Sequence, residues 1–196
     1  MIIKITHLFP DLLNMYGDRG NIEALRHRLI WRGIDVEVRE HTMNMGELDL
    51  TDTDILLIGG GGETEERKAV SALRHYSEAI KEYVEANKTL IAVCGGFPIL
   101  GTYYTDGNTK VEGAGVLDIY TEPADKRFIG DTVIKSDIID STIVGFTNHG
   151  GRTYINNYAP LGEVVTGFGN NSEDTGEGVQ YKNVFATYLH GPLLPK

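Results

Sequence analysis

Cysteine is nearly absent from this chain, which contains only Cys94 among 196 residues. One cysteine cannot form an intrachain disulfide, so a disulfide-stapled secreted scaffold is excluded and a reactive thiol is the notable alternative. Positive charge is also scarce, with 18 basic against 28 acidic residues and a formal net charge of −10. This balance repels phosphate backbones and anionic membrane surfaces, so we expect no nucleic-acid partner.

Long hydrophobic runs are missing as well. No apolar stretch approaches the length needed to span a bilayer, and Met1–Pro10 does not combine a charged leader with a long apolar segment. We therefore expect a cytoplasmic protein that is not an integral membrane protein. No linker, internal repeat or low-complexity segment interrupts the sequence, so a single domain over residues 1–196 is expected.

The first half of the chain alternates predicted strands and helices. Short β-rich or continuous apolar runs predict strands at Ile2–Phe9, Ile34–Val38, Ile55–Ile58 and Thr89–Val93. Apolar residues at helical spacing predict helices over Asn21–Arg32 and Glu65–Ala86, and a further helix is expected after Cys94. This alternation predicts an α/β fold with a mostly parallel central sheet, helices on both faces and ligands at the carboxyl ends of the strands.

The second half has a different pattern. Its apolar runs are short, are separated by turns, and lie at Val116–Thr121, Phe128–Ile134, Thr142–Phe146, Gly162–Thr166 and Val184–Leu189. We interpret them as extra antiparallel strands and loops of the same domain. The acidic, Gly/Asn-rich stretch Gly167–Gly178 is predicted to be a mobile surface loop.

The segment Thr89–Gly101 contains the candidate nucleophile. Five strand-forming residues run directly into Cys94, and Gly95 and Gly96 then allow a tight turn into the expected helix. A residue on such a turn is presented at the sheet edge beside the positive end of the helix, which favours the thiolate. The alternative is that Cys94 is a small buried hydrophobic residue, but a core cysteine does not require two glycines after it.

Four glycines, Gly59–Gly62, end the strand at Ile55–Ile58. Their backbone N–H groups and that of Gly95 could form an oxyanion hole beside Cys94. A plain tight turn is the structural alternative. A phosphate-binding loop is less favoured, because Glu63, Glu65 and Glu66 follow the glycines where a Lys-Ser/Thr pair would be expected.

Six histidines are candidates for the base, and four of them lie within predicted strands or helices as ordinary polar residues: His7, His27, His41 and His75. His149 and His190 each follow a β-like run and precede glycine. His190 ends the clearer strand, so we expect its imidazole to share the sheet edge with Cys94. A Cys/His pair is the minimum requirement for acyl transfer through a thiolate.

Three motifs resemble class I glutamine amidotransferase domains, in particular the cobyric-acid-synthase-like branch. They are Cys94-Gly95-Gly96-Phe97, Leu57-Ile58-Gly59-Gly60 and Thr187-Tyr188-Leu189-His190-Gly191. Within that branch, three longer segments are similar to the glutaminase subunits of lipid II isoglutaminyl synthases, namely His7–Asn21, Asn148–Thr153 and Tyr188–Lys196. The resemblance extends over essentially the whole chain.

The resemblance implies hydrolysis of glutamine to glutamate and ammonia. Cys94 would attack the side-chain amide and form a glutamyl thioester, with His190 as the proton carrier. The N–H groups of Gly60 and Gly95 would hold the oxyanion. Arg127 matches the family's substrate-binding arginine and would hold the α-carboxylate of glutamine, the alternative being a surface charge in the basic pair Lys126-Arg127.

The resemblance also implies a heterodimer with a Mur-ligase-like subunit. That partner would bind ATP and Mg²⁺, activate the α-carboxyl of D-glutamate in lipid II, and use the ammonia to form D-isoglutamine. We expect no cofactor and no metal site in this chain, which shows neither a nucleotide loop nor a metal-ligand cluster. Two alternatives stay open: an amidotransferase for another carboxylate acceptor such as cobyrinate, and a non-catalytic subunit that binds glutamine.

The sequence departs from the family pattern at three places. Pro98 stands where many members have Gln, so one polar contact near glutamine is expected to be missing. Pro192 stands where related glutaminases have Glu, two residues after the histidine, and the group that orients His190 is therefore not identified. Relatives continue with a further helical segment, whereas this sequence stops at Lys196, which leaves open a longer natural protein.

Overall fold

The computed structural model describes residues 1–15, 17–107 and 109–191. Its centre is a six-stranded sheet with the strand order β13-β14-β4-β3-β1-β2. Five strands run parallel, namely β1 (Ile2–Leu8), β2 (Asp35–His41), β3 (Ile55–Ile58), β4 (Thr89–Val93) and β14 (Val184–Thr187). The edge strand β13 (Val179–Tyr181) is antiparallel to β14. The predicted α/β fold with a mostly parallel central sheet is confirmed.

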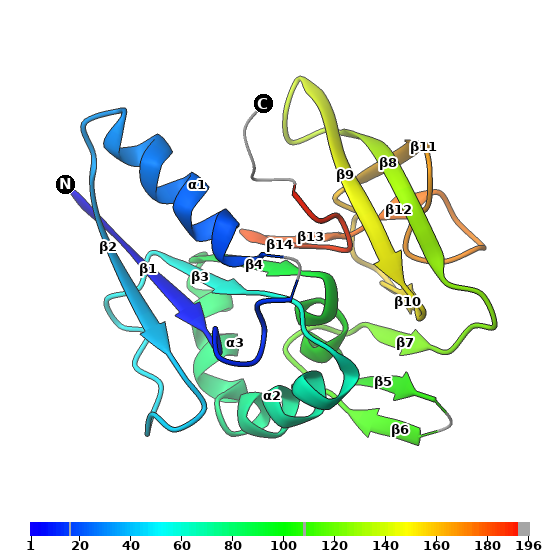
Figure 1. Cartoon of the computed structure of the whole chain (residues 1–196), viewed down its shortest axis with the longest axis horizontal. Helices are drawn as coiled ribbons and strands as arrows, with labels where there is room; N and C mark the ends of the chain where they lie inside the picture. The colour runs from blue at the N-terminus through cyan, green and yellow to red at the C-terminus, as the bar shows by residue number, and fades with distance from the viewer. Residues whose placement is uncertain (16, 108, 192–196) are drawn as a thin grey trace.

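Helices cover both faces of this sheet (Figure 1). On one face, helix α1 (Arg19–Ile30) packs Ile22 against Ile5 and Leu57. On the other face, α2 (Glu63–His75) and α3 (Ser77–Glu85) pack against Leu56 and Ile58. Neighbouring residues of β3 thus point to opposite cores, which is why a continuous apolar run forms a strand buried on both sides. No helix in the described part of the chain is both long and apolar enough to cross a membrane.

The predicted helix Glu65–Ala86 is two helices that meet at Tyr76. This residue has φ −98° and ψ 4°, outside the helical range, and its N–H donates to the Leu73 carbonyl at 3.0 Å. Its hydroxyl donates to the Gly46 carbonyl at 2.7 Å, and its ring lies edge-on to His41 at 5.4 Å between centroids. These tertiary contacts outweigh the uninterrupted apolar spacing that predicted one helix.

The second half forms two four-stranded sheets beside the central one (Figure 1). Sheet B has the order β10 (Arg152–Tyr154), β7 (Tyr120–Glu122), β5 (Tyr103–Asp106) and β6 (Thr109–Glu112). Sheet C has the order β12 (Gly176–Glu177), β11 (Gly162–Thr166), β8 (Phe128–Ser136) and β9 (Ser141–His149). Extra antiparallel strands were predicted here, and all of these pairs are antiparallel except the parallel pair β5 and β7.

Two details of the second half differ from prediction. The predicted strand Val116–Thr121 is wrong over its first part, because Val116 and Leu117 are loop residues whose N–H groups donate to the Leu100 carbonyl. The predicted surface loop Gly167–Gly178 is correct for the exposed residues 172–175 and wrong for the buried residues 169–171 and 176–178. Asn170 is 1% exposed and exchanges two hydrogen bonds with the Gly178 backbone, at 2.7 and 2.8 Å, so its amide side chain is a buried structural contact. Amide side chains can replace backbone partners in this way, and composition alone does not reveal it.

Candidate active site

A cavity of about 730 Å³ lies where the central sheet meets the second half of the chain. Its lining includes Glu66, Cys94 and Gly95 from the first half, and Arg127, His149 and Tyr188 from the second half. Of the residues that the sequence indicated, the structure therefore brings Cys94, Gly95 and Arg127 to one cavity. Gly60 and His190 are not among the described residues that line it.

Cys94 occupies the turn that the sequence predicted. Strand β4 ends at Val93, and Cys94 adopts φ +52°, a left-handed conformation that is uncommon for residues other than glycine. The turn is tight, because a Cβ on Gly96 would lie 2.7 Å from the Gly59 carbonyl oxygen. A side chain held on a sharp turn at a strand end is the arrangement seen for exposed nucleophiles, although here Cys94 is only 7% exposed.

The expected helix after Cys94 is replaced by two short 3₁₀ turns, Cys94–Gly96 and Pro98–Leu100. The predicted positive helix end beside the thiol is therefore wrong, since such short turns lack the aligned peptide dipoles of a long helix. Burial raises the pKa of the Cys94 thiol to about 12, and the carboxylate of Glu66 raises it further. Both causes disfavour the thiolate, contrary to the expectation from the sequence.

Gly60 lies directly against Cys94. A Cβ on Gly60 would be 2.8 Å from Cys94 Cβ and 3.3 Å from Sγ, so only glycine fits at this position. Its N–H donates to Asp18 Oδ2 at 2.9 Å, and Asp18 is 3% exposed. Burial raises the pKa of the Asp18 carboxyl to about 6. The predicted oxyanion donor is thus beside the thiol but is engaged by a buried acid, and its role stays a prediction that requires release of this N–H.

Arg127 lines the cavity from the segment just before β8. Its Nε donates to Asn148 Oδ1 and its Nη2 to the Asn148 carbonyl, each at 3.1 Å. Its Nη1 is close to Gly150, where a Cβ would lie 3.2 Å away. These contacts with the β9 end orient the guanidinium toward the cavity, which is more specific than a surface charge in a basic pair.

The two candidate histidines occupy different surroundings. His149 lines the cavity, its Nδ1 donates to the Gly151 carbonyl at 2.8 Å, and its ring stacks on Tyr188 at 3.7 Å between centroids. Burial lowers the pKa of His149 to about 4. His190 follows β14, whose Thr187 is paired with Val93 of β4, so His190 and Cys94 leave adjacent parallel strands at the same sheet edge. Burial also lowers the pKa of His190.

The His190 backbone is joined to strand β9. The His190 N–H donates to the Phe146 carbonyl at 2.8 Å, and the Phe146 N–H donates to the His190 carbonyl at 3.1 Å. Gly145 permits this approach, because a Cβ there would lie 2.7 Å from Leu189 Cβ. Sheet C therefore holds the segment that carries the predicted base.

Two residues beside Cys94 were not predicted as functional, namely Asp18 and Glu66. Glu66 was considered only as a negative charge that disfavours phosphate, whereas its carboxyl reaches the cavity beside Gly95. Both acids lie next to glycine-rich turns in the sequence, and this position is the pattern that could have indicated a role at the site. Pro98 lines the cavity at the start of the second 3₁₀ turn and presents no polar side-chain group there. Pro192 and the rest of the motif to Lys196 lie outside the described residues.

The comparisons with known proteins agree on one family. Residues 4–196 match the model of the CobB/CobQ-like glutamine amidotransferase domain. The lipid II isoglutaminyl synthase (glutamine-hydrolyzing) subunit GatD of Staphylococcus aureus is 46% identical, over 99% of this chain and 79% of that protein. The subunit of the same name from Streptococcus pneumoniae is 41% identical, over 99% of this chain and 75% of that protein.

More distant relatives share the architecture. A probable cobyric acid synthase of Methanococcus maripaludis is 28% identical, over 81% of this chain and 35% of that protein. Among solved structures, PurLQS from Thermotoga maritima has a TM-score of 0.67 at 18% identity and covers 98% of this chain and 89% of the matched chain. A glutamine amidotransferase from the same organism has a TM-score of 0.63 at 14% identity, covering 96% and 75%. At these identities the solved structures show the fold alone.

Proposed function

This chain belongs to the CobB/CobQ-like glutamine amidotransferase family, and on that premise we propose that it is the glutaminase subunit of a lipid II isoglutaminyl synthase. It hydrolyses glutamine and supplies ammonia to a Mur-ligase-like subunit, which binds ATP and Mg²⁺. That partner amidates the α-carboxyl of D-glutamate in lipid II during peptidoglycan synthesis. In this proposal residues 1–196 act as one amidotransferase domain.

The proposed reaction has two steps. His190 takes the proton of the Cys94 thiol as the sulfur attacks the amide carbon of glutamine, and when the C–N bond breaks the departing nitrogen takes that proton from His190 and leaves as ammonia. Water then attacks the thioester with His190 as base, the C–S bond breaks, and glutamate is released with the thiol restored. Arg127 holds the α-carboxylate, while the N–H groups of Gly60 and Gly95 stabilise the oxyanion.

The observation that carries this assignment is the identity of 46% and 41% to two GatD subunits over nearly the whole chain. The cobyric acid synthase relative reaches 28% and matches only 35% of that longer protein. The position of Cys94 in a cavity with Arg127 supports glutaminase chemistry specifically, because it places a nucleophile and a carboxylate receptor together.

Partner dependence is part of the proposal. The Cys94 thiol has a raised pKa and the Gly60 N–H is engaged by Asp18, so two requirements of the mechanism are unmet in the isolated chain. Binding of the Mur-ligase-like subunit near the cavity mouth rearranges the Gly59–Gly62 loop and completes the site. The isolated chain then turns over slowly, which avoids wasteful loss of ammonia to water.

Ammonia release by the chain alone and by the reconstituted pair tests the proposal, together with mass analysis of lipid II. We expect slow release by the chain, a marked rise with the partner, and ATP-dependent amidation of lipid II. Equal turnover with and without the partner would contradict partner dependence. Amidation of another carboxylate instead of lipid II would identify a different acceptor, and no release in either case would identify a non-catalytic subunit.

A further inference from the structure

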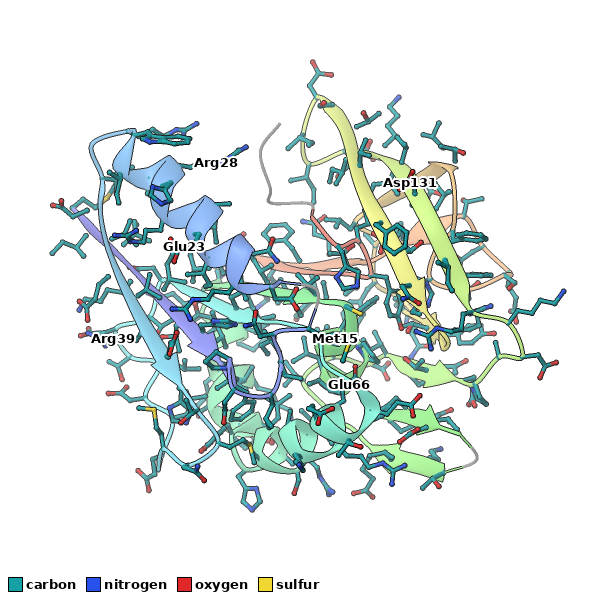
Figure 2. The ribbon with its side chains drawn as sticks, viewed as in Figure 1. Met15, Glu23, Arg28, Arg39, Glu66 and Asp131 are labelled. Carbon is teal, nitrogen blue, oxygen red and sulfur yellow. The ribbon has the colours of Figure 1, made fainter. Side chains whose placement is uncertain are left out.

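Glu66 is an acid that lies beside Gly95, the residue after the candidate nucleophile. Its carboxyl approaches Gly95 so closely that a Cβ on Gly95 would overlap Oε1 and Cδ, so a larger residue at position 95 would displace this carboxyl. The same carboxyl accepts a hydrogen bond from the Gly61 N–H. Figure 2 shows Glu66 near Met15 at the centre of the molecule, and both side chains line the cavity. The Glu66 carboxyl therefore occupies the space next to Gly95 on the cavity wall.

Among the described residues, Arg127 is the cation that lowers the pKa of Glu66, whereas Arg67 on the same helix is paired with Asp106. The charged and titratable groups that interact with the Glu66 carboxyl are Glu63 on the same helix, and Asp106, Tyr104, Arg127, Cys94 and Tyr188 from other elements. Burial raises the pKa of Glu66 to about 8, and Glu63 and Asp106 raise it further. An added cation in the cavity would stabilise the ionised form of this carboxyl.

We propose that Glu66 binds the α-ammonium group of free glutamine, while Arg127 binds its α-carboxylate. The inference rests on the glutaminase function proposed above. Arg127 reaches the cavity from the β8 side and Glu66 from helix α2, and Cys94 lies on the cavity wall next to Gly95. Glutamine carries both charges on one carbon, two methylenes from the amide carbon that reacts. The cavity thus offers a separate group to each charge of the zwitterion and a nucleophile to the amide.

This assignment predicts selectivity for free glutamine. A glutamine whose α-nitrogen is acylated, as within a peptide, has no ammonium to offer Glu66 and leaves the carboxyl protonated. Hydrogen bonds to charged groups are stronger than those between neutral groups, and the discrimination expected from one such bond is about ten- to a hundredfold. Glu66 is then a specificity residue that touches substrate and takes no part in bond breaking.

Two substrates separate this role from a structural one: L-glutamine and glutaramate, which keeps the amide and the carboxylate but lacks the amino group. With the chain and its partner reconstituted, we expect kcat/KM for glutamine to exceed that for glutaramate by about ten- to a hundredfold. In Glu66→Gln the ratio should fall to within about threefold, because glutamine loses and glutaramate keeps its rate. Glu65→Gln removes a neighbouring charge on α2 and should keep the wild-type ratio.

The outcomes are distinct. If Glu66→Gln keeps the wild-type ratio, or if it slows both substrates equally, Glu66 does not bind the ammonium and the inference is overturned. Retained turnover of glutaramate shows that the variant is folded with a working thiol. If the wild-type pair releases no ammonia from either compound, the proposed glutaminase function itself fails.

A pH series on the wild-type pair provides the second measurement. Only the ionised carboxylate attracts the ammonium, and with a pKa of about 8 its population rises roughly eightfold from pH 7 to pH 8.5. The glutamine-to-glutaramate ratio of kcat/KM should rise with pH over this interval, whereas titration of Cys94 and His190 cancels from the ratio. A ratio that does not change with pH would contradict the inference even if Glu66→Gln fails to fold.

Discussion

The two walls of the cavity differ in their buried titratable groups. The wall from the first half of the chain, here the acid wall, includes Gly61, Gly62, Glu63, Glu66, Cys94 and Gly95. The wall from the second half, here the base wall, includes Thr121, Arg127, Asn148, His149 and Tyr188, together with the acids Asp106 and Asp125. Burial raises the pKa of Glu66 and Cys94 on the acid wall and lowers the pKa of His149 on the base wall.

The comparison shows that burial disfavours the charged forms of Glu66 and Cys94 on one wall and of His149 on the other. Desolvation favours a neutral carboxyl and thiol on one side and a neutral imidazole on the other, so the two walls do not neutralise each other by proton transfer. Arg127 on the base wall is exposed, in contrast to the buried His149. A ligand that brings its own positive and negative charge compensates both walls at once.

The largest effect should come from the acid wall. Cys94→Ala removes the acyl carrier, so we expect the partner-bound chain to lose all measurable ammonia release. A glutamine-mimicking electrophile should add to the wild-type protein at Cys94 and leave the variant unlabelled, as intact mass and peptide mapping would show. The urea unfolding midpoint serves as the check on folding. Undiminished glutaminase activity in Cys94→Ala would refute the assignment of the nucleophile.

The next effect compares the two histidines. His190→Ala should lower glutaminase turnover by about 10²–10⁴, the usual scale for loss of a general base, whereas His149→Ala on the base wall should lower it less. Steady-state ammonia release by both variants with the partner present gives the ranking. If His149→Ala were the more damaging change, the base would be His149, and the base wall would supply the proton carrier directly.

A smaller effect is expected from Glu177, a buried acid that contacts the backbone of Tyr188 on the base wall. Glu177 accepts hydrogen bonds from the Tyr188 N–H at 2.7 Å and from the Thr187 hydroxyl, and burial raises its pKa to about 7. The folded state therefore holds this proton more tightly than the unfolded chain, whose ordinary pKa is 4.5. The contribution to stability is full below about pH 4.5 and is lost as pH rises to about 7.

In Glu177→Gln this pH dependence should be absent, because the neutral amide does not titrate. As pH rises, the unfolding free energy of the wild type should therefore fall by about 3 kcal/mol more than that of the variant. Urea unfolding at pH 5 and pH 8 measures it, with the exposed Glu47→Gln as the matched control. A wild-type loss that persists unchanged in Glu177→Gln would assign it to other groups, such as Asp18 and Glu66.

The smallest effect is expected from removing the hydrogen bond between the Gly60 N–H and Asp18, which keeps this N–H from an oxyanion. Asp18→Ala removes the acceptor of the Gly60 N–H, so this donor becomes available to the oxyanion. We expect turnover by the isolated chain to rise by about tenfold, below the full value of an oxyanion donor because the loop must still be ordered. With the partner bound, the variant and the wild type should differ little.

Asp35→Ala, which removes an exposed acid at the start of β2, is the control for this change. Turnover by isolated Asp18→Ala at or below the wild-type rate would show that the Asp18 contact does not restrain the site. The comparison is made on ammonia release per chain at saturating glutamine.

More of the acid wall than of the base wall can be predicted from the sequence. The strand Ile55–Ile58 and the Cys94 turn follow from local patterns, namely a continuous apolar run and the glycines after it. The base wall depends on contacts between distant segments, such as Arg127 with Asn148 and Tyr188 with His149. Arg127 was identified through family resemblance, and its orientation could not be derived from any local pattern.

Protonation states were the least predictable property. The glycines after Cys94 suggested a helix and hence a thiolate, but Pro98 begins a second 3₁₀ turn and the thiol is buried beside Glu66. Desolvation is a property of the assembled cavity, so a linear sequence gives no measure of it. The same reason explains why Asp18 and Glu66 were missed: their significance comes from proximity to Gly60 and Gly95 in the folded protein.

The paired hydrogen bonds between Phe146 and His190 give the molecule a mechanical linkage. Strands β8 and β9 form the long hairpin of the four-stranded sheet C, which lies beside the central sheet in Figure 1, and His190 is tied to the β9 strand by both of its backbone groups. A displacement of β9 relative to the central sheet would therefore either move the His190 backbone with it or break both hydrogen bonds, so the position of sheet C and that of the His190 segment are coupled.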